Sequence, residues 1–114
     1  MITGKVIKGA GRGRDMGFPT ANLDIENIEA EEGIWIGYAD KKPALIFIGA
    51  AKTFGETQKR AEVYLLDFDG DLYGQEIAVE LIEKIRENNK FDNPGALIEQ
   101  MKQDEITARK YFKL

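Results

Sequence analysis

Short apolar runs, separated by turn-forming and charged residues, dominate this chain up to about residue 90. Residues 2–8 roughly alternate apolar and polar side chains, which predicts a strand. The runs 33–39 and 44–50 are also β-rich, and the short gap from Asp40 to Pro43 predicts an antiparallel hairpin. Pro19 disfavours helix around it, so residues 20–25 are expected to be extended. This pattern predicts a sheet or a barrel.

A second hairpin is predicted after residue 60. The apolar run 61–68 is followed by Asp69-Gly70-Asp71, and Asp-Gly is a strong signal for a tight turn that needs positive φ. The run from Leu72 onward is therefore expected to pair with the run 61–68.

Helical periodicity appears in about the last twenty residues. Asn93 followed by Pro94 is typical of an N-cap and a first helical residue. Apolar residues then recur at helical spacing, at Leu97, Met101, Ala108 and Phe112. Asp104 falls on the same stripe, where a carboxylate needs partners. We predict a structural role for Asp104, as the cap of a loop.

The 114 residues fit one domain, residues 1–114, with 43% hydrophobic and 32% charged content typical of a globular chain. A chain this short buries one modest core. Five or six strands and one C-terminal helix favour an all-β fold, an antiparallel barrel or barrel-like sheet with a C-terminal helix.

The chain contains no cysteine and no histidine. Disulfides, thiolate metal sites and the commonest general base are therefore excluded, and catalysis would depend on carboxylates, Lys, Arg, hydroxyls and bound metal. The net charge of −4 and the pI of about 4.9 disfavour an extended nucleic-acid interface, although one nucleotide needs only a local nest and a metal. No signal-like N-terminus or long apolar run is found, which predicts a cytoplasmic protein without membrane contact.

The segment 9–17 has four glycines and two arginines, so its backbone N–H groups and guanidiniums could approach a phosphate. It does not match the P-loop pattern, and taken alone a flexible turn between strands is the commoner interpretation of such a segment.

Two strand segments carry oxygen groups. In an extended chain Thr20 and Asn22 point to the same side, and their oxygens suit Mg²⁺; the alternative is solvent-facing polar residues at a strand start. Glu62 opens the apolar run Val63 to Leu66. Pointing into a barrel, it could have a raised pKa and act as general base; the alternative is an exposed strand-end glutamate.

The polar loop 86–91 is equally compatible with a lid over a planar anionic ligand and with a solvated connection.

Together these segments resemble the riboflavin kinase family along nearly the whole chain. The similarity runs through Gly4-x-Val6, Gly9-x-Gly11-Arg12-Gly13, Gly17-Phe18-Pro19-Thr20-Ala21-Asn22-Leu23, Gly33-Ile34, Ile48-Gly49, Thr53-Phe54, Glu62, Asp67-Phe68, Asp71-Leu72-Tyr73-Gly74, Arg86, Lys90-Phe91 and Gln100-x-x-x-Asp104. The resemblance implies a six-stranded antiparallel Greek-key barrel with a C-terminal helix. It also implies Mg²⁺-dependent transfer of the γ-phosphate of ATP to the ribityl 5′-hydroxyl of riboflavin, giving FMN and ADP.

The resemblance further implies roles for individual residues. Glu62 would be the catalytic base, and Thr20 and Asn22 would bind the metal. The nucleotide would contact Gly9, Gly11, Arg12, Gly13, Arg14, Thr20, Leu65, Asp67 and Tyr73. The flavin would contact Arg86, Asn89 and Phe91.

Two other classes of protein are weighed against this enzyme. A barrel that binds flavin or nucleotide without turnover would not need Thr20, Asn22 and Glu62 together, so their presence favours the enzyme. A nucleic-acid-binding barrel is disfavoured because no basic stripe with interleaved aromatics is found. FAD synthesis is not expected, because the chain lacks the adenylyltransferase domain of bifunctional enzymes, and a monomer is expected.

Overall fold

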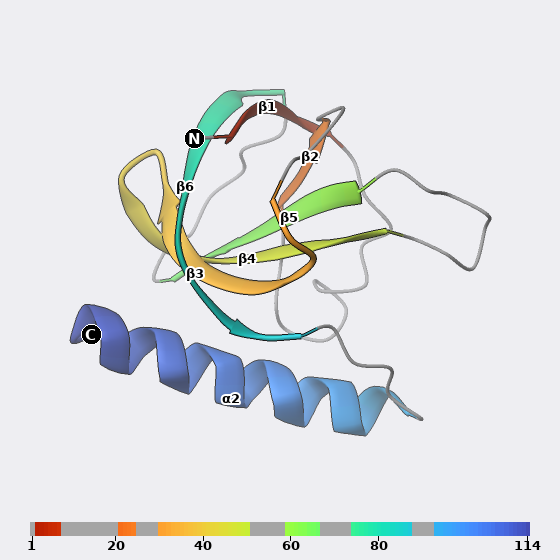
Figure 1. Ribbon diagram of the computed structural model, residues 1–114, viewed down its shortest axis with the longest axis vertical. Coiled ribbons are helices and arrows are strands. Elements are labelled where there is room, and N and C mark those ends of the chain that lie inside the picture. Colours follow the sequence, from red (N-terminus) through yellow and green to blue (C-terminus); the bar gives the residue numbers. More distant parts are fainter. Residues whose placement is uncertain (1, 8–20, 25–29, 51–58, 67–73, 88–92) are drawn as a thin grey trace.

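The structure is a computed structural model that describes residues 2–7, 21–24, 30–50, 59–66, 74–87 and 93–114 (Figure 1). The described elements are β1 (Ile2–Ile7), β2 (Ala21–Asp24), β3 (Gly33–Ala39), β4 (Lys42–Ala50), β5 (Lys59–Leu65), β6 (Glu76–Arg86) and α2 (Pro94–Phe112). In these ranges no helix is both long enough and apolar enough to cross a membrane.

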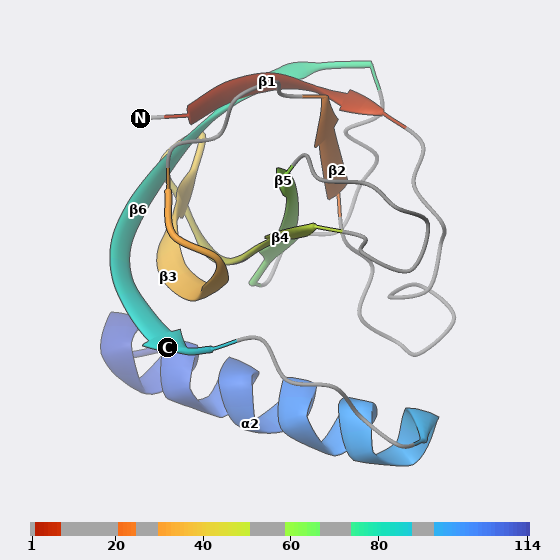
Figure 2. The same cartoon turned by 45° about the vertical axis from the view of Figure 1, so that its right-hand side comes forward.

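The six strands form a closed antiparallel barrel in the order β1-β2-β5-β4-β3-β6. Strands β3, β4 and β5 follow one another as neighbours, while β2 returns beside β5 and β6 lies beside β3. Both arrangements are Greek keys, so the predicted fold is confirmed. Figure 2 shows the strands encircling the interior, with α2 outside the ring.

The predicted hairpin between β3 and β4 is confirmed, with a shorter turn than expected. Asp40 and Lys41 alone form it, with φ angles of 48° and 69°, and Pro43 already pairs with Tyr38 inside the ladder. The Asp40 carboxylate accepts a hydrogen bond from the Ala78 N–H at 2.8 Å, which ties the turn to β6.

The second predicted hairpin is wrong for the described strands. β5 pairs with β2 and β4, whereas β6 pairs with β1 and β3. In a closed barrel each strand pairs with two neighbours, and β5 already pairs with β2 on one edge and β4 on the other. The Asp69-Gly70-Asp71 segment lies outside the described residues, and its local turn preference does not decide which strands pair.

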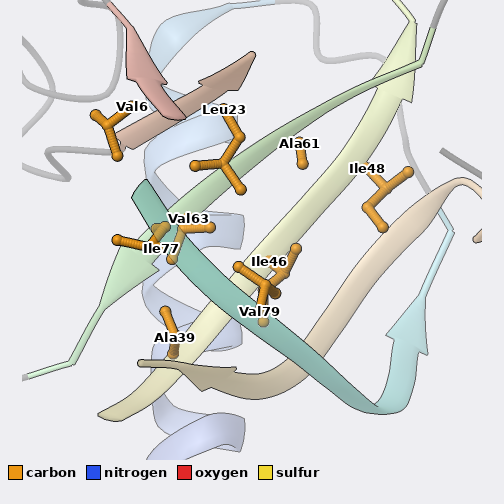
Figure 3. Close-up of a cluster of buried hydrophobic side chains, with 10 residues drawn as sticks. Val6, Leu23, Ala39, Ile46, Ile48, Ala61, Val63, Ile77 and Val79 are labelled. Atoms are coloured by element: carbon orange, nitrogen blue, oxygen red, sulfur yellow. The ribbon is translucent and has the colours of Figure 1, made fainter. Parts of the chain in front are cut away.

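The barrel interior is filled by side chains from every strand. Those drawn in Figure 3 include Val6, Leu23, Ala39, Ile46, Ile48, Ala61, Val63, Ile77 and Val79, each at most 5% exposed. Because side chains alternate along a strand, the residues between them face outward.

A second apolar cluster lies between the barrel wall and α2. Its buried members come from β3, β4, the residue after β5, and the helix: Ile34, Ile36, Leu45, Leu66 and Ala108. The predicted helix is confirmed: Asn93 caps it by accepting a hydrogen bond from the Ala96 N–H at 2.8 Å, and Pro94 follows directly. The predicted apolar stripe therefore fixes the helix on the outer face of the sheet.

Gly37 in β3 lies against the backbone of β6. A Cβ atom there would lie 2.0 Å from the Glu80 carbonyl oxygen and 2.9 Å from the Ile46 Cδ1 atom. The β3–β6 register also shifts between Ile36 and Gly37. The irregular pairing thus depends on the missing side chain.

We expect Gly37→Ala to lower the free energy of unfolding by about 3 kcal/mol or more, because backbone atoms must move to admit the methyl group. Gly74→Ala is the matched control: its Cβ would meet nothing within 4 Å, but its φ of 83° is strained, so a cost of about 1–2 kcal/mol is expected. Urea unfolding measures both. Equal midpoints for Gly37→Ala and the wild type would contradict the packing argument.

Candidate active site

One cross-strand row on the outer face of the barrel joins three of the predicted site residues. Adjacent strands pair these positions in succession: Ile7, Asn22, Glu62, Phe47, Ile34 and Arg86. Directly paired residues of an antiparallel sheet share a face and have neighbouring Cβ atoms. Four strand spacings of about 4.8 Å put roughly 19 Å between Asn22 and Arg86 along the curved surface.

Glu62 lies on the outer face, so the prediction that it points into the barrel is wrong. Its neighbours Ala61 and Val63 are 1% exposed and belong to the interior cluster, which turns the Glu62 side chain outward, where it is exposed. The exact alternation of the sheet decides this orientation. A role for Glu62 as a base therefore depends on its neighbours on the outer surface and not on burial inside the barrel.

Asn22 is directly opposite Glu62. It lies between Ala21 and Leu23, which face the interior, so its carboxamide and the Glu62 carboxylate occupy the same surface at paired positions. Thr20, the predicted second metal ligand, lies outside the described residues.

Arg86 ends the row on the far side and is the last residue of β6, not part of a loop. Its Nε and Nη2 atoms donate to the two carboxylate oxygens of Asp104 in α2, at 2.8 and 2.6 Å. Its Nη1 atom donates to the carbonyl oxygen of Glu87 at 3.0 Å. Asp104 thus has hydrogen-bond partners, as its predicted structural role requires. The prediction that it caps a loop is wrong, because the carboxylate joins α2 to the end of β6.

Leu65, a predicted nucleotide contact, does not lie in the outer-face row with Asn22, Glu62 and Arg86. It packs against the interior cluster and pairs with Ala44, so it lies on the opposite face of the barrel wall from Glu62. The remaining predicted contacts lie outside the described residues: Gly9, Gly11, Arg12, Gly13, Arg14, Asp67, Tyr73, Asn89 and Phe91.

Phe47 is a member of the row that sequence reasoning did not single out. It pairs with Glu62 on one side and with Ile34 on the other, and it packs against the cluster beneath α2. The alternation of β4, with Ile46 and Ile48 facing inward, was the available signal. It places an aromatic ring beside the candidate base.

A second contact between the sheet and α2 begins two residues from Glu62. The Tyr64 hydroxyl donates to a carboxylate oxygen of Glu105 at 2.8 Å, and Arg109 approaches the same oxygen at 3.5 Å. The helix is therefore attached to β5 as well as to the end of β6.

Lys84 ties the segment before β3 to the end of β6. Its ammonium donates to Glu31 at 2.8 Å and to Glu87 at 2.6 Å, while Trp35 donates its indole N–H to the Glu31 carbonyl at 3.0 Å. The hydrogen bond to Glu31, together with that to Glu87, raises the pKa of Lys84 above its ordinary value of about 10.5.

We expect Lys84→Gln to destabilise the protein, by an amount that falls at high pH. Because folding raises the pKa of Lys84, its contribution is fully present below about pH 10 and is lost as the pH rises through the folded-state value. Thermal melts at about pH 8 and about pH 11.5 should show a narrowing difference in Tm from the wild type. Lys102→Gln, at an exposed position of α2, controls for the loss of one charge. A difference that stays constant or widens would contradict the assignment.

Comparison with known proteins points to one family. The sequence model of the family described as "Flavokinase: Riboflavin kinase" matches residues 1–112. The chain is 41% identical over 97% of its length to the trifunctional protein RibF/MnmA of Mycoplasmoides gallisepticum, and 37% identical over 99% to the bifunctional riboflavin kinase/FMN adenylyltransferase of Escherichia coli. It is 35% identical over 100% of its length to the RNA-binding riboflavin kinase RibR of Bacillus subtilis.

The chain spans 18%, 38% and 52% of the lengths of these three relatives. Among solved structures, a protein named macrolide-efflux protein from Streptococcus pneumoniae matches with a TM-score of 0.84 and 33% identity, over 94% of this chain and 37% of that one. The family model thus matches nearly every residue of the chain, and the fold is the Greek-key barrel with an outer helix that the resemblance implies. The chain belongs to the riboflavin kinase (flavokinase) family.

Proposed function

We propose that this chain is a riboflavin kinase, which transfers the γ-phosphate of ATP to the 5′-hydroxyl of riboflavin and so produces FMN and ADP. Family membership supports the reaction class, and relatives named riboflavin kinase align with the chain over nearly its whole length. The other activities that those names contain are not assigned to this chain.

The observation that carries the proposal is the outer-face row. Next to Ile7 the row pairs a carboxamide with a carboxylate, Asn22 with Glu62, and its far end holds a guanidinium, Arg86. Between them lies the partly exposed side chain of Phe47, while Ile34, which pairs with Arg86, is buried beneath α2. Riboflavin has a matching arrangement, since a hydroxylated chain that accepts the phosphate is attached to a flat aromatic ring system.

Glu62 has the chemistry of a general base at the phosphate end. Phosphoryl transfer depends mainly on positioning and charge neutralisation, so one carboxylate that accepts the proton of the 5′-hydroxyl is sufficient. The pairing of β5 with β2 and β4 fixes the backbone of Glu62 on both sides. The strand thereby supplies the rigid support that a positioned base needs.

Magnesium fits the donor set beside Glu62. Mg²⁺ prefers hard oxygen ligands and is usually held by one or two protein groups together with substrate phosphates and water. The Asn22 side chain offers such an oxygen on the same face as the base. Bound there with ATP, the ion would neutralise charge on the phosphates, while Asn22 would hold it and Glu62 would accept the proton.

The direct test is to incubate the purified chain with riboflavin, ATP and Mg²⁺ and to separate FMN from riboflavin by chromatography. FMN formation that requires all three components supports the proposal. Riboflavin binding without FMN formation would instead indicate a flavin-binding barrel without turnover.

We expect Glu62→Gln to lower kcat by about 10²- to 10⁴-fold with little change in riboflavin affinity, because it keeps the side-chain shape but removes the proton acceptor. Glu83→Gln, at an exposed position of β6, is the matched control and should retain wild-type turnover. Turnover by Glu62→Gln within a few-fold of the wild type would rule out Glu62 as an essential base.

Asn22→Ala is expected to weaken binding of Mg-ADP by about 10- to 100-fold, the loss typical of one contact to a charged group. Asp24→Ala, two residues along β2 on the same face, is the control. Calorimetric titration of both variants with ADP, with and without Mg²⁺, measures the effect. If Asn22→Ala loses no affinity, or loses as much without the metal, the metal role of Asn22 is wrong.

A further inference from the structure

Asp104 is the one charged residue among the described residues that is buried, at 2% exposure. It lies on the apolar stripe of α2 between Met101 and Ala108, where a carboxylate without partners would carry a large desolvation cost. It accepts two hydrogen bonds from Arg86 and a third from the Gln100 side chain at 3.1 Å. The helix therefore supplies a buried carboxylate whose desolvation is compensated by the Arg86 guanidinium and the Gln100 amide.

The two-pronged contact fixes the plane of the Arg86 guanidinium. Nε and Nη2 lie along one edge of the group and both contact Asp104, while Nη1 contacts the Glu87 carbonyl on the strand's own continuation. A planar group held at two edges cannot rotate about its long axis. The guanidinium plane therefore has one orientation, and the side chain is 17% exposed.

A guanidinium fixed in this way is suited to stacking on a flat aromatic ligand. Arginine stacks on aromatic faces, which a lysine ammonium cannot reproduce because it has no plane. Arg86 ends the row that also carries Asn22 and Glu62, so a ligand whose phosphate-accepting chain lies at Glu62 and extends past Phe47 would have its ring on the side toward Arg86.

We infer that Asp104 is a positioning residue that orients the Arg86 guanidinium as a stacking surface for the flavin ring, an inference that rests on the proposed function. Asp104 acts on riboflavin affinity through Arg86 and has no part in the transfer of the phosphate. Gln100 supports it by holding the same carboxylate oxygen that receives the Arg86 Nε–H.

Two variants test the inference. Asp104→Asn keeps the shape but loses the charge and one acceptor, and Arg86→Lys keeps the charge but loses the plane. Each should raise the KM for riboflavin and its Kd, measured by flavin fluorescence, by roughly 10-fold, the order of one stacking contact. Both kcat at saturating riboflavin and the KM for ATP should stay within roughly 3-fold of the wild type.

Glu105→Gln is the matched control, because it disturbs a different polar contact between α2 and the sheet, the hydrogen bond from the Tyr64 hydroxyl to Glu105. It should leave the KM for riboflavin unchanged. Circular dichroism establishes which variants fold. If Asp104→Asn does not fold, Gln100→Ala takes its place and should raise the KM for riboflavin roughly 3-fold, the loss of one modest hydrogen bond.

The inference is overturned if folded Asp104→Asn or Arg86→Lys binds riboflavin as the wild type does, or if Glu105→Gln loses as much affinity. A wild type that binds riboflavin without phosphorylating it would refute the kinase proposal but not this inference. The fluorescence titrations would still show whether the variants bind riboflavin more weakly than the wild type. A wild type that neither binds nor phosphorylates riboflavin would refute both.

Discussion

The structure depends on strands that are buried on both faces. In β4, Ala44, Leu45 and Ile46 are consecutive and each is at most 1% exposed, because one side of the strand lines the barrel interior and the other lies under α2. Burial of the outward face against the helix gives a small barrel a second apolar layer, which adds to the limited core that a chain of this size can form. It also leaves part of the outer face, around Asn22 and Glu62, available for polar residues.

The helix that completes this layer also brings a charge into it. Arg86 and Asp104 form an ion pair whose side chains are 17% and 3% exposed. Loss of one partner of such a pair costs about 3–5 kcal/mol, whereas apolar replacements of both are often neutral. Stability alone therefore gives little reason for the pair, whereas the proposed orienting role of Asp104 at the end of the site does.

The proposed site differs from a pocket in the barrel interior. The interior is filled by aliphatic side chains, as Figure 3 shows, and the candidate residues lie on the wall that faces away from it. Strand pairing sets their order, since neighbouring strands bring together residues that are forty positions apart in the chain, as with Asn22 and Glu62. The barrel thus acts as a rigid support, and its outer surface carries the proposed chemistry.

The sequence by itself determined the local elements: the strand runs, the β3–β4 hairpin, the Asn93 cap and the apolar stripe of α2 were predicted because each depends on residues close in the chain. The motif order also predicted the family and the barrel. Only the tertiary structure decided the partners of β5, the outward direction of Glu62 and the contact between Asp104 and Arg86. These depend on barrel closure and on which face each strand presents to the helix, and such long-range choices leave no trace in local spacing.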